Sequence, residues 1–267
     1  MNETSTAESA PARSGTQSIQ RAAAVVRAIA ARSRAGLRLS EVVQHAHLER
    51  STARRILKCL IDEGFVMQEA PSQRYFLGPL VFELGLAAAP QFNLAGLCRP
   101  ALQRIAAATG DTVFLVVRSG HDSVCIDRHE GSYPIKALTL DIGARRPLGA
   151  GAGGLALLMP LPDAAVDEIV AANAVRIAAY HGLIVPALHA MLARSRQLGY
   201  ALNDAHITPG AVSIGMPICN RFGSPFAALS VGAIASRMGA ERQCEIATIL
   251  RTEVQQLKRA LGEATQP

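Results

Sequence analysis

The sequence has few cysteines, and their arrangement suits neither covalent cross-linking nor metal binding. Five occur in 267 residues, widely scattered and without a C-x-x-C pair. An odd, scattered set argues against a disulfide framework and against a structural zinc site. We expect small buried thiols in the reducing cytosol, and we expect neither a metal site nor a cofactor.

Long apolar runs are also missing. The longest stretch of low charge, from Pro147 to Pro162, is interrupted by glycine and proline and is too short to span a bilayer, so we expect no membrane segment. Residues 1–17 lack the apolar part of a secretory signal, and we expect a short disordered leader there. Hydrophobic residues make up 49% of the chain, which excludes a disordered protein and allows one large domain or two modest ones.

Positive charge is concentrated near the N-terminus. Residues 18–60 carry nine Lys or Arg and two Glu, a net charge of +7, against +6 for the whole chain. A compact cationic segment joined to a nearly neutral remainder is typical of a module that binds a polyanion. An ordinary solvated helical face is the alternative.

The cationic segment also has the periodicity of a small helical domain. Apolar residues at helical spacing predict three helices, at 18–34, 41–45 and from about 51 to 63. Ser40 would cap the second helix, and Gly64 would end the third. Two short strands follow, at 65–68 and 75–77. This order is the layout of a winged helix-turn-helix domain.

The third helix begins with polar and cationic residues and becomes apolar later. A recognition helix needs this order, because its first residues enter the major groove. Arg54 can reach guanine O6 and N7, Arg55 suits a phosphate, and an arginine at the wing tip can enter a minor groove. The predicted DNA-binding residues are Ser40, Arg50, Ser51, Thr52, Arg54, Arg55, Lys58, Gln73 and Arg74. The alternative is that Ser51 only caps the helix and the arginines are solvated.

The remaining chain predicts hairpins with helices outside them. Expected strands cover 112–118, 123–130, 136–141, 212–219 and 226–233. Expected helices cover 80–89, 93–109, 186–197 and 240–260. Hairpins of this kind indicate an α+β fold with a largely antiparallel sheet, and not a series of βαβ units.

Two motifs suggest enzymes. Gly149-x-Gly151-x-x-Gly154 matches a dinucleotide fingerprint, but no buried strand and no βαβ unit surround it. Ala211-x-Ser213-x-Gly215 is similar to a nucleophile elbow, yet Ser213 falls inside a predicted strand and no histidine follows it. The glycine segment can instead open a helix whose free N–H groups accept a carboxylate, or it can be a packing turn. We therefore expect no catalytic residues and no enzyme.

Blocks along most of the chain resemble one family. SIQRAAAVVRAIA, LSEVVQHAHLERSTARRILKCLIDEGFVMQ, RRPLGAGAGGLALL and GYALND followed by PGAVSIGMPICNRFGSPFAALSVGA are similar, in order and spacing, to the IclR family of bacterial transcriptional regulators. The resemblance implies a winged helix domain, a linker helix and an α/β effector-binding domain similar to the GAF fold. It also implies a homodimer or a dimer of dimers on palindromic double-stranded DNA.

The resemblance further implies an effector pocket. Residues that match its lining are Ile135, Leu138, Ala152, Gly153, Asn203, Ala211, Ser213, Ser230 and Gly232. The chain departs from the family pattern, because Gly149, Gly151 and Leu155 replace a His, a Thr and a Lys, and Asn203 replaces an acid. We therefore expect a roomier, less polar pocket for an organic or aromatic acid. Plain core packing is the alternative for each residue.

These expectations divide the chain into a leader (1–17), a winged helix-turn-helix domain (18–78), a linker helix (79–92) and an effector-binding and oligomerisation domain (93–267). The expected function is a cytoplasmic DNA-binding regulator controlled by a small carboxylic acid. Two alternatives stay open: a nucleotide-binding enzyme that uses the Gly149–Gly154 loop, and a DNA-binding protein whose second domain only dimerises.

Overall fold

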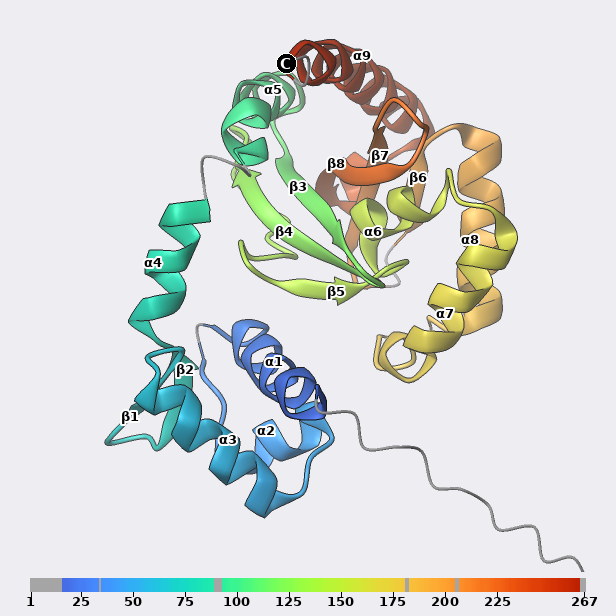
Figure 1. The fold of residues 1–267 in the computed structure, drawn as a ribbon. Helices are drawn as coiled ribbons and strands as arrows, with labels where there is room; N and C mark the ends of the chain where they lie inside the picture. Colours follow the sequence, from blue (N-terminus) through green and yellow to red (C-terminus); the bar gives the residue numbers. More distant parts are fainter. Residues whose placement is uncertain (1–15, 34, 89–92, 181–182, 205–206, 265–267) are drawn as a thin grey trace, which may run out of the picture. The chain divides into compact units, whose positions relative to one another are not determined.

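The chain forms two compact units that divide between Ala89 and Pro90. The computed structural model describes residues 16–33, 35–88, 93–180, 183–204 and 207–264 (Figure 1). The leader expected over residues 1–17 therefore falls almost wholly outside the described residues, and the first helix begins at its last position, Gln17.

The N-terminal unit is a helical domain with a β-hairpin wing. Its elements are α1 (Gln17–Ala30), α2 (Leu39–Ala46), α3 (Arg50–Asp62), β1 (Val66–Glu69), β2 (Arg74–Leu77) and α4 (Pro79–Ala88). The core draws Val25 and Ile29 from α1, Val42 from α2 and Leu57 from α3, all of them inaccessible to water. Tyr75 of β2 joins this core, so the wing packs against the helices. The winged helix-turn-helix layout expected from the sequence is confirmed.

The start of α2 differs from the prediction. Arg38, and not Ser40, is the N-cap residue, and Ser40 lies within the first turn. The carboxylate of Glu41 accepts a hydrogen bond of 2.7 Å from the backbone N–H of Arg38, which satisfies a free donor at the helix start. Gly64 after α3 has a positive φ of 75°, as expected for the glycine that ends a helix.

The α4 helix has no buried residue within the described chain. Phe82 and Leu86 lie one turn apart and are 69% and 59% exposed, and Leu84 is also exposed. Surface helices normally bury an apolar stripe, so α4 presents apolar surface that its own unit does not cover.

The C-terminal unit is built on one six-stranded sheet in which every pairing is antiparallel. Its strands are β3 (Thr112–Ser119), β4 (Asp122–His129), β5 (Arg145–Pro147), β6 (Ala201–Asp204), β7 (Ala211–Cys219) and β8 (Pro225–Ile234), in the order β5-β4-β3-β8-β7-β6. Its helices are α5 (Leu94–Thr109), α6 (Gly151–Leu158), α7 (Asp163–Ile177), α8 (Val185–Leu198) and α9 (Ala240–Ala264), with a 3-10 turn η2 (Ala235–Arg237). The expected α+β class is confirmed.

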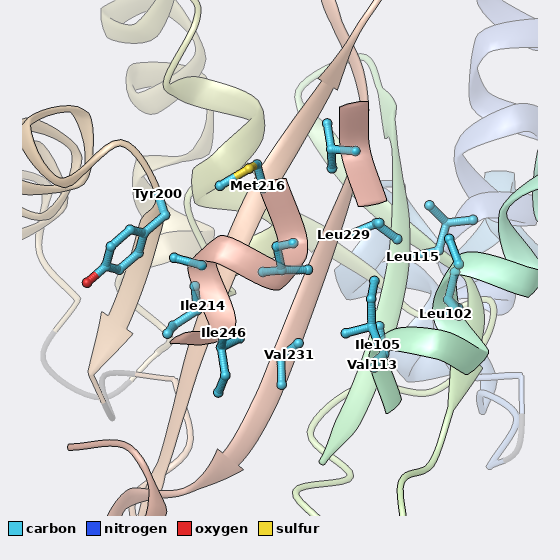
Figure 2. Packing of buried hydrophobic residues seen from close by; sticks show 14 of the residues in the cluster. Leu102, Ile105, Val113, Leu115, Tyr200, Ile214, Met216, Leu229, Val231 and Ile246 are labelled. Atoms are coloured by element: carbon cyan, nitrogen blue, oxygen red, sulfur yellow. The ribbon is translucent and has the colours of Figure 1, made fainter. Parts of the chain in front are cut away.

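Alternation along the strands produces two cores, one on each face of the sheet. In β3, Val113 and Leu115 pack with α5 and α9, while Phe114 and Val116 pack with α6, α7 and α8. Successive side chains of a strand point to opposite faces, so a strand buried on both faces is apolar throughout. Figure 2 shows the first of these cores, where Leu102 and Ile105 of α5 lie against Val113 and Leu115 of the sheet.

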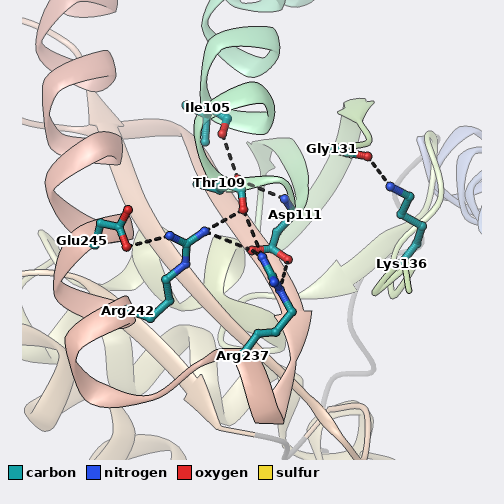
Figure 3. Close-up of polar contacts among 8 residues, drawn as sticks. All are labelled: Ile105, Thr109, Asp111, Gly131, Lys136, Arg237, Arg242 and Glu245. Atoms are coloured by element: carbon teal, nitrogen blue, oxygen red, sulfur yellow. Dashed lines mark hydrogen bonds and ion pairs between the residues drawn. The ribbon is translucent and has the colours of Figure 1, made fainter. Parts of the chain in front are cut away.

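A charged cluster ties the end of α5 to the start of α9 (Figure 3). The buried carboxylate of Asp111 accepts from the Nε of Arg237 at 3.0 Å and lies 3.7 Å from a guanidinium nitrogen of Arg242. Both arginines also donate to the Thr109 carbonyl, at 3.3 Å and 2.6 Å. Arg237 stacks on the ring of Tyr133, 3.8 Å from its centroid. The carboxylate is thus buried with its charge paired.

The expected strand at 136–141 does not form. The Thr139 N–H donates to the Ala137 carbonyl, which closes a short turn in the middle of the segment. Residues 143–147 take the place beside β4 instead: Gly143 and Ala144 exchange hydrogen bonds with Cys125, and β5 pairs with the start of β4. The helix α7, the edge strand β6 and the 3-10 turn η2 were likewise not anticipated from the sequence.

Candidate nucleic-acid interface and ligand cavity

The α3 helix separates a buried face from a cationic face. Ala53, Leu57 and Leu60 are buried in the unit's core. Its exposed residues are Arg50, Ser51, Arg54, Arg55 and Lys58, followed by Cys59, Ile61 and Asp62 at its C-terminal end, and Thr52 is half-buried. The helix starts at Arg50, one residue earlier than expected, after Glu49 in the N-cap position. The apolar spacing of the helix therefore directs its cations away from the protein.

The cations of α3 have no acidic partner among the described residues. Other arginines of the protein are paired, such as Arg104 with Glu253 at 2.6 Å and Arg145 with Asp122 at 3.0 Å. Within the described part of the chain, neither an ion pair nor a side-chain hydrogen bond engages Arg50, Arg54, Arg55 or Lys58. Exposed, uncompensated cations on one helix face attract a polyanion.

Arg74 does not reach outward as the sequence suggested. Its Nη1 donates to the carbonyls of Ala35 and Gly36, at 3.3 Å and 2.9 Å, and lies 3.4 Å from the carboxylate of Glu41. The guanidinium of Arg74 thus joins the wing to the turn before α2, and its entry into a minor groove stays a prediction. Gln73 is exposed at the tip, with a positive φ of 56° and a side-chain bond to the Ala70 carbonyl. Ser40 is exposed on α2.

The C-terminal unit contains a cavity on the α6 face of its sheet. It is partly open to solvent, and the space between its lining residues, the open part included, is about 520 Å³. Seven of the nine residues expected in the pocket line it: Ala152, Gly153, Asn203, Ala211, Ser213, Ser230 and Gly232. They come from the start of α6 and from β6, β7 and β8. Residues far apart in the sequence therefore meet, because alternation places them on the same face.

Ile135 and Leu138 do not line this cavity and are 56% and 49% exposed. The turn that replaces the expected strand presents their neighbours Thr139 and Leu140 to the cavity instead. The resemblance implied strand positions for both residues, and the turn between Ala137 and Thr139 replaces that strand, so neither side chain is held toward the cavity.

Glycine permits α6 to lie close to the sheet. A Cβ on Gly215 of β7 would stand 2.5 Å from the carbonyl oxygen of Ala152, and a Cβ on Gly153 would stand 2.8 Å from Val116. Such distances are shorter than real contacts, so a side chain at either position would push the helix away. The glycines therefore bring the free N–H groups at the start of α6 to the cavity.

Arg146 lines the same cavity from β5 and was not among the residues predicted from the sequence. Its neighbour Arg145 points to the other face and pairs with Asp122. Burial lowers the pKa of the Arg146 guanidinium from its ordinary value. The doublet Arg145–Arg146 was the available signal, because two consecutive residues of a strand point to opposite faces. The cavity therefore contains one cation that the predicted lining did not include.

Asn203 carries a buried donor without an acceptor. The residue is 2% exposed, lies on the edge strand β6 and lines the cavity, and its Nδ2 has no hydrogen-bond partner among the described residues. A buried unpaired amide is unfavourable unless something else satisfies it.

The described residues offer no cluster of His, Cys, Asp and Glu suited to a metal ion. In the part of the chain that is described, none of the helices combines the length and the apolar character needed to cross a membrane.

Two family models match the chain. One, described as the IclR helix-turn-helix domain, matches residues 18–70, and the other, described as the C-terminal part of the bacterial transcriptional regulator IclR, matches residues 86–259. The chain is 27% identical over 252 residues to the HTH-type transcriptional repressor AllR of Klebsiella pneumoniae, covering 94% of this chain and 92% of that protein. It is 27% identical over 256 residues to the transcriptional repressor IclR of Escherichia coli (strain K12), covering 95% and 93%.

A solved structure has the same fold. An IclR homolog from Microbacterium hydrocarbonoxydans, complexed with 4-hydroxybenzoate, superposes with a TM-score of 0.68 at 22% sequence identity. The match covers 92% of this chain and 99% of that one.

Proposed function

This chain belongs to the IclR family of bacterial transcriptional regulators, and on that premise we propose that it binds a palindromic operator as a homodimer, or as a dimer of dimers, under the control of a small carboxylic acid. The protein then works on the chromosome in the cytoplasm and catalyses no reaction. Its affinity for the operator changes when the acid occupies the cavity of the C-terminal unit.

One observation carries the DNA-binding part of the proposal. The exposed face of α3 holds Arg50, Arg54, Arg55 and Lys58, and none has an acidic partner among the described residues. Arg54 is the strongest candidate for a base contact, because a guanidinium can donate two parallel hydrogen bonds to guanine. The flanking cations, with Ser51 and Thr52, suit phosphates, which position the helix.

The cavity supports control by a small molecule. It is concave, bounded by α6 and the sheet, and lined by polar groups from separate strands, as ligand sites commonly are. A purely dimerising domain has no need of such a space. The antiparallel sheet also argues against the nucleotide-binding enzyme, because the dinucleotide fingerprint requires a parallel βαβ unit.

The uncovered apolar face of α4 supports the homodimer. Phe82 and Leu86 expose large side chains that a second copy could bury. A two-fold dimer presents two α3 helices to two half-sites, which is why a palindromic operator fits.

Arg54→Ala tests the DNA-binding proposal. Selection from fragmented genomic DNA with the purified wild-type chain identifies the operator, and titration then gives its affinity. We expect the variant to bind the operator about 1–3 kcal/mol more weakly and with relaxed base preference at one position, because a bidentate base contact is lost. Circular dichroism checks that α3 stays folded.

Arg221→Ala is the matched control, because it removes an exposed arginine from the turn between β7 and β8 in the other unit. It is expected to leave operator affinity unchanged. Equal losses on operator and random DNA for Arg54→Ala would assign Arg54 to a phosphate. An unchanged affinity would remove α3 from the interface.

A further inference from the structure

The cavity contains a cation without a counter-ion. Thr139 accepts a hydrogen bond from the Nη2 of Arg146 through its backbone carbonyl, which is neutral. Among the described residues, no carboxylate pairs with Arg146, and those that line the cavity include neither Asp nor Glu. Arginine stays protonated in proteins even when it is partly buried, so the charge persists. A buried charge is unfavourable unless it is paired.

The position of Arg146 makes this cost larger. Its Nη1 lies 3.5 Å from the place that a Cβ on Gly151 would take, at the first residue of α6. The start of a helix carries partial positive charge and favours anions, whereas cations are favoured at the opposite end. A guanidinium and a helix N-terminus therefore face the same space with the same sign. Only an anion between them is attracted to both.

Asn203 provides an independent second contact. Its unpaired Nδ2 needs an acceptor, and it lines the same cavity from the edge strand opposite β5. The hydroxyl of Ser230 lies 3.4 Å from the position of a Cβ on Gly153, so further polar atoms surround the start of α6. The positive charge of one guanidinium and one helix N-terminus is compensated by one carboxylate. The side-chain amide of Asn203 is an uncharged donor. The second group on the ligand is therefore an uncharged oxygen.

We propose that Arg146 selects the effector: its guanidinium and the N–H groups that open α6 hold one carboxylate between them, and Asn203 donates to an uncharged oxygen elsewhere on the same molecule. The proposed binding site depends on the proposed function in one respect only, which is that the bound ligand is called an effector. The ligand class is a monocarboxylate with a second, neutral hydrogen-bond acceptor.

Binding to the full-length chain is measured without DNA, by calorimetry and thermal shift. The probes are benzoate, its uncharged isostere benzamide, and 4-hydroxybenzoate. We expect benzoate to bind more tightly than benzamide, because only benzoate carries the charge. We expect 4-hydroxybenzoate to bind about three- to tenfold more tightly than benzoate, the range of one neutral hydrogen bond.

The variants separate the two contacts. Arg146→Gln is expected to weaken both acids about ten- to hundredfold and to leave benzamide unchanged, because a charged hydrogen-bond donor is lost. Asn203→Leu is expected to remove the advantage of 4-hydroxybenzoate over benzoate. Arg145→Gln, one residue away on the other face, is the matched control and is expected to change no affinity for the three probes.

The melting temperature of the ligand-free protein tests the role of Arg146 independently of any ligand. Arg146→Gln is expected to raise the melting temperature of the free protein by about 2–4 °C, because an unpaired cation disappears. A lower melting temperature with unchanged benzoate affinity would make Arg146 a brace for Thr139 and overturn the proposal. Equal binding of benzoate and benzamide, or no binding of any acid, would overturn it too. Acid binding that depends on Arg146 without any effect on operator affinity would leave the cavity assignment intact and refute the proposed function.

Discussion

Arginine side chains in the N-terminal unit differ in their interaction partners. Arg54 is exposed and unpaired among the described residues, whereas Arg74 contacts two backbone carbonyls and the carboxylate of Glu41. The pKa of Glu41 is lowered, mainly because its carboxylate accepts from the backbone N–H of Arg38, and the charge of Arg74 adds to this. The same residue type is therefore engaged by internal contacts in one place and left exposed for a partner in the other.

Arg74→Ala should therefore act on stability. We expect the free energy of unfolding to fall by about 1 kcal/mol, because hydrogen bonds from a charged donor are lost at a partly exposed site. Urea unfolding measures this, with Arg55→Ala as the control that removes an unpaired surface arginine. Unchanged stability together with altered preference for flanking bases would mean that the wing contacts a groove after all.

Cavity residues show how small side chains act on a site. Gly153 and Gly215 have no side chain that could bind a ligand, but they let α6 approach the sheet closely. Ser213 and Gly215 lie on the same face of β7, so the strand alternates between the apolar core and the cavity. The position of α6 thus determines the direction in which the backbone N–H groups at its N-terminus point.

At the scale of elements, α6 and β7 form the contact on which the cavity depends. Gly215→Ala places a Cβ 2.5 Å from the Ala152 carbonyl oxygen. We expect a loss of about 1–3 kcal/mol in the free energy of unfolding, typical of an overpacked core. Because α6 must shift, benzoate binding should weaken as well. Thermal unfolding and calorimetry measure the two effects.

Gly239→Ala is the matched control, since no atom lies within 4 Å of its added Cβ and its φ is not positive. It should leave both quantities unchanged. If Gly215→Ala unfolded like the wild type and bound benzoate equally well, the close approach of α6 would have no role in the cavity.

For the whole molecule, the positive charge is concentrated in the N-terminal unit. Residues 18–60 carry +7 against +6 for the chain, so the remainder is close to neutral. Under the proposed regulation, the acid must bind more tightly to one arrangement of the proposed dimer than to another, with a coupling of about 1–3 kcal/mol.

Operator binding should therefore fall steeply with salt. The logarithm of the binding constant is expected to decrease linearly with that of the salt concentration, with a slope of about −0.9 for each phosphate neutralised. Arg55→Ala should reduce the slope by about one, because one phosphate contact disappears. Arg221→Ala, in the near-neutral part, should leave it unchanged. A flat salt response in gel shifts would contradict a role for the cationic segment.

Most of the secondary structure could be predicted from the sequence alone. Apolar spacing predicted α1, α3, the wing and the two long hairpins, because these patterns repeat at 3.6 or 2 residues and need no distant partner. The same spacing indicated that the cations of α3 face outward. That these residues contact DNA stays a prediction, and the family resemblance rests on blocks that the family models also match.

Tertiary structure decided which polar groups meet. The sequence predicted Arg74 as a DNA contact at the wing tip and did not single out Arg146. The structure shows that Arg74 donates to the Gly36 carbonyl and that Arg146 lines a cavity beside the start of α6. A turn at Ala137 likewise displaced Ile135 and Leu138 from the pocket. Periodicity reports which way a side chain faces along its own element, whereas its partners are set by long-range packing, which no local pattern records.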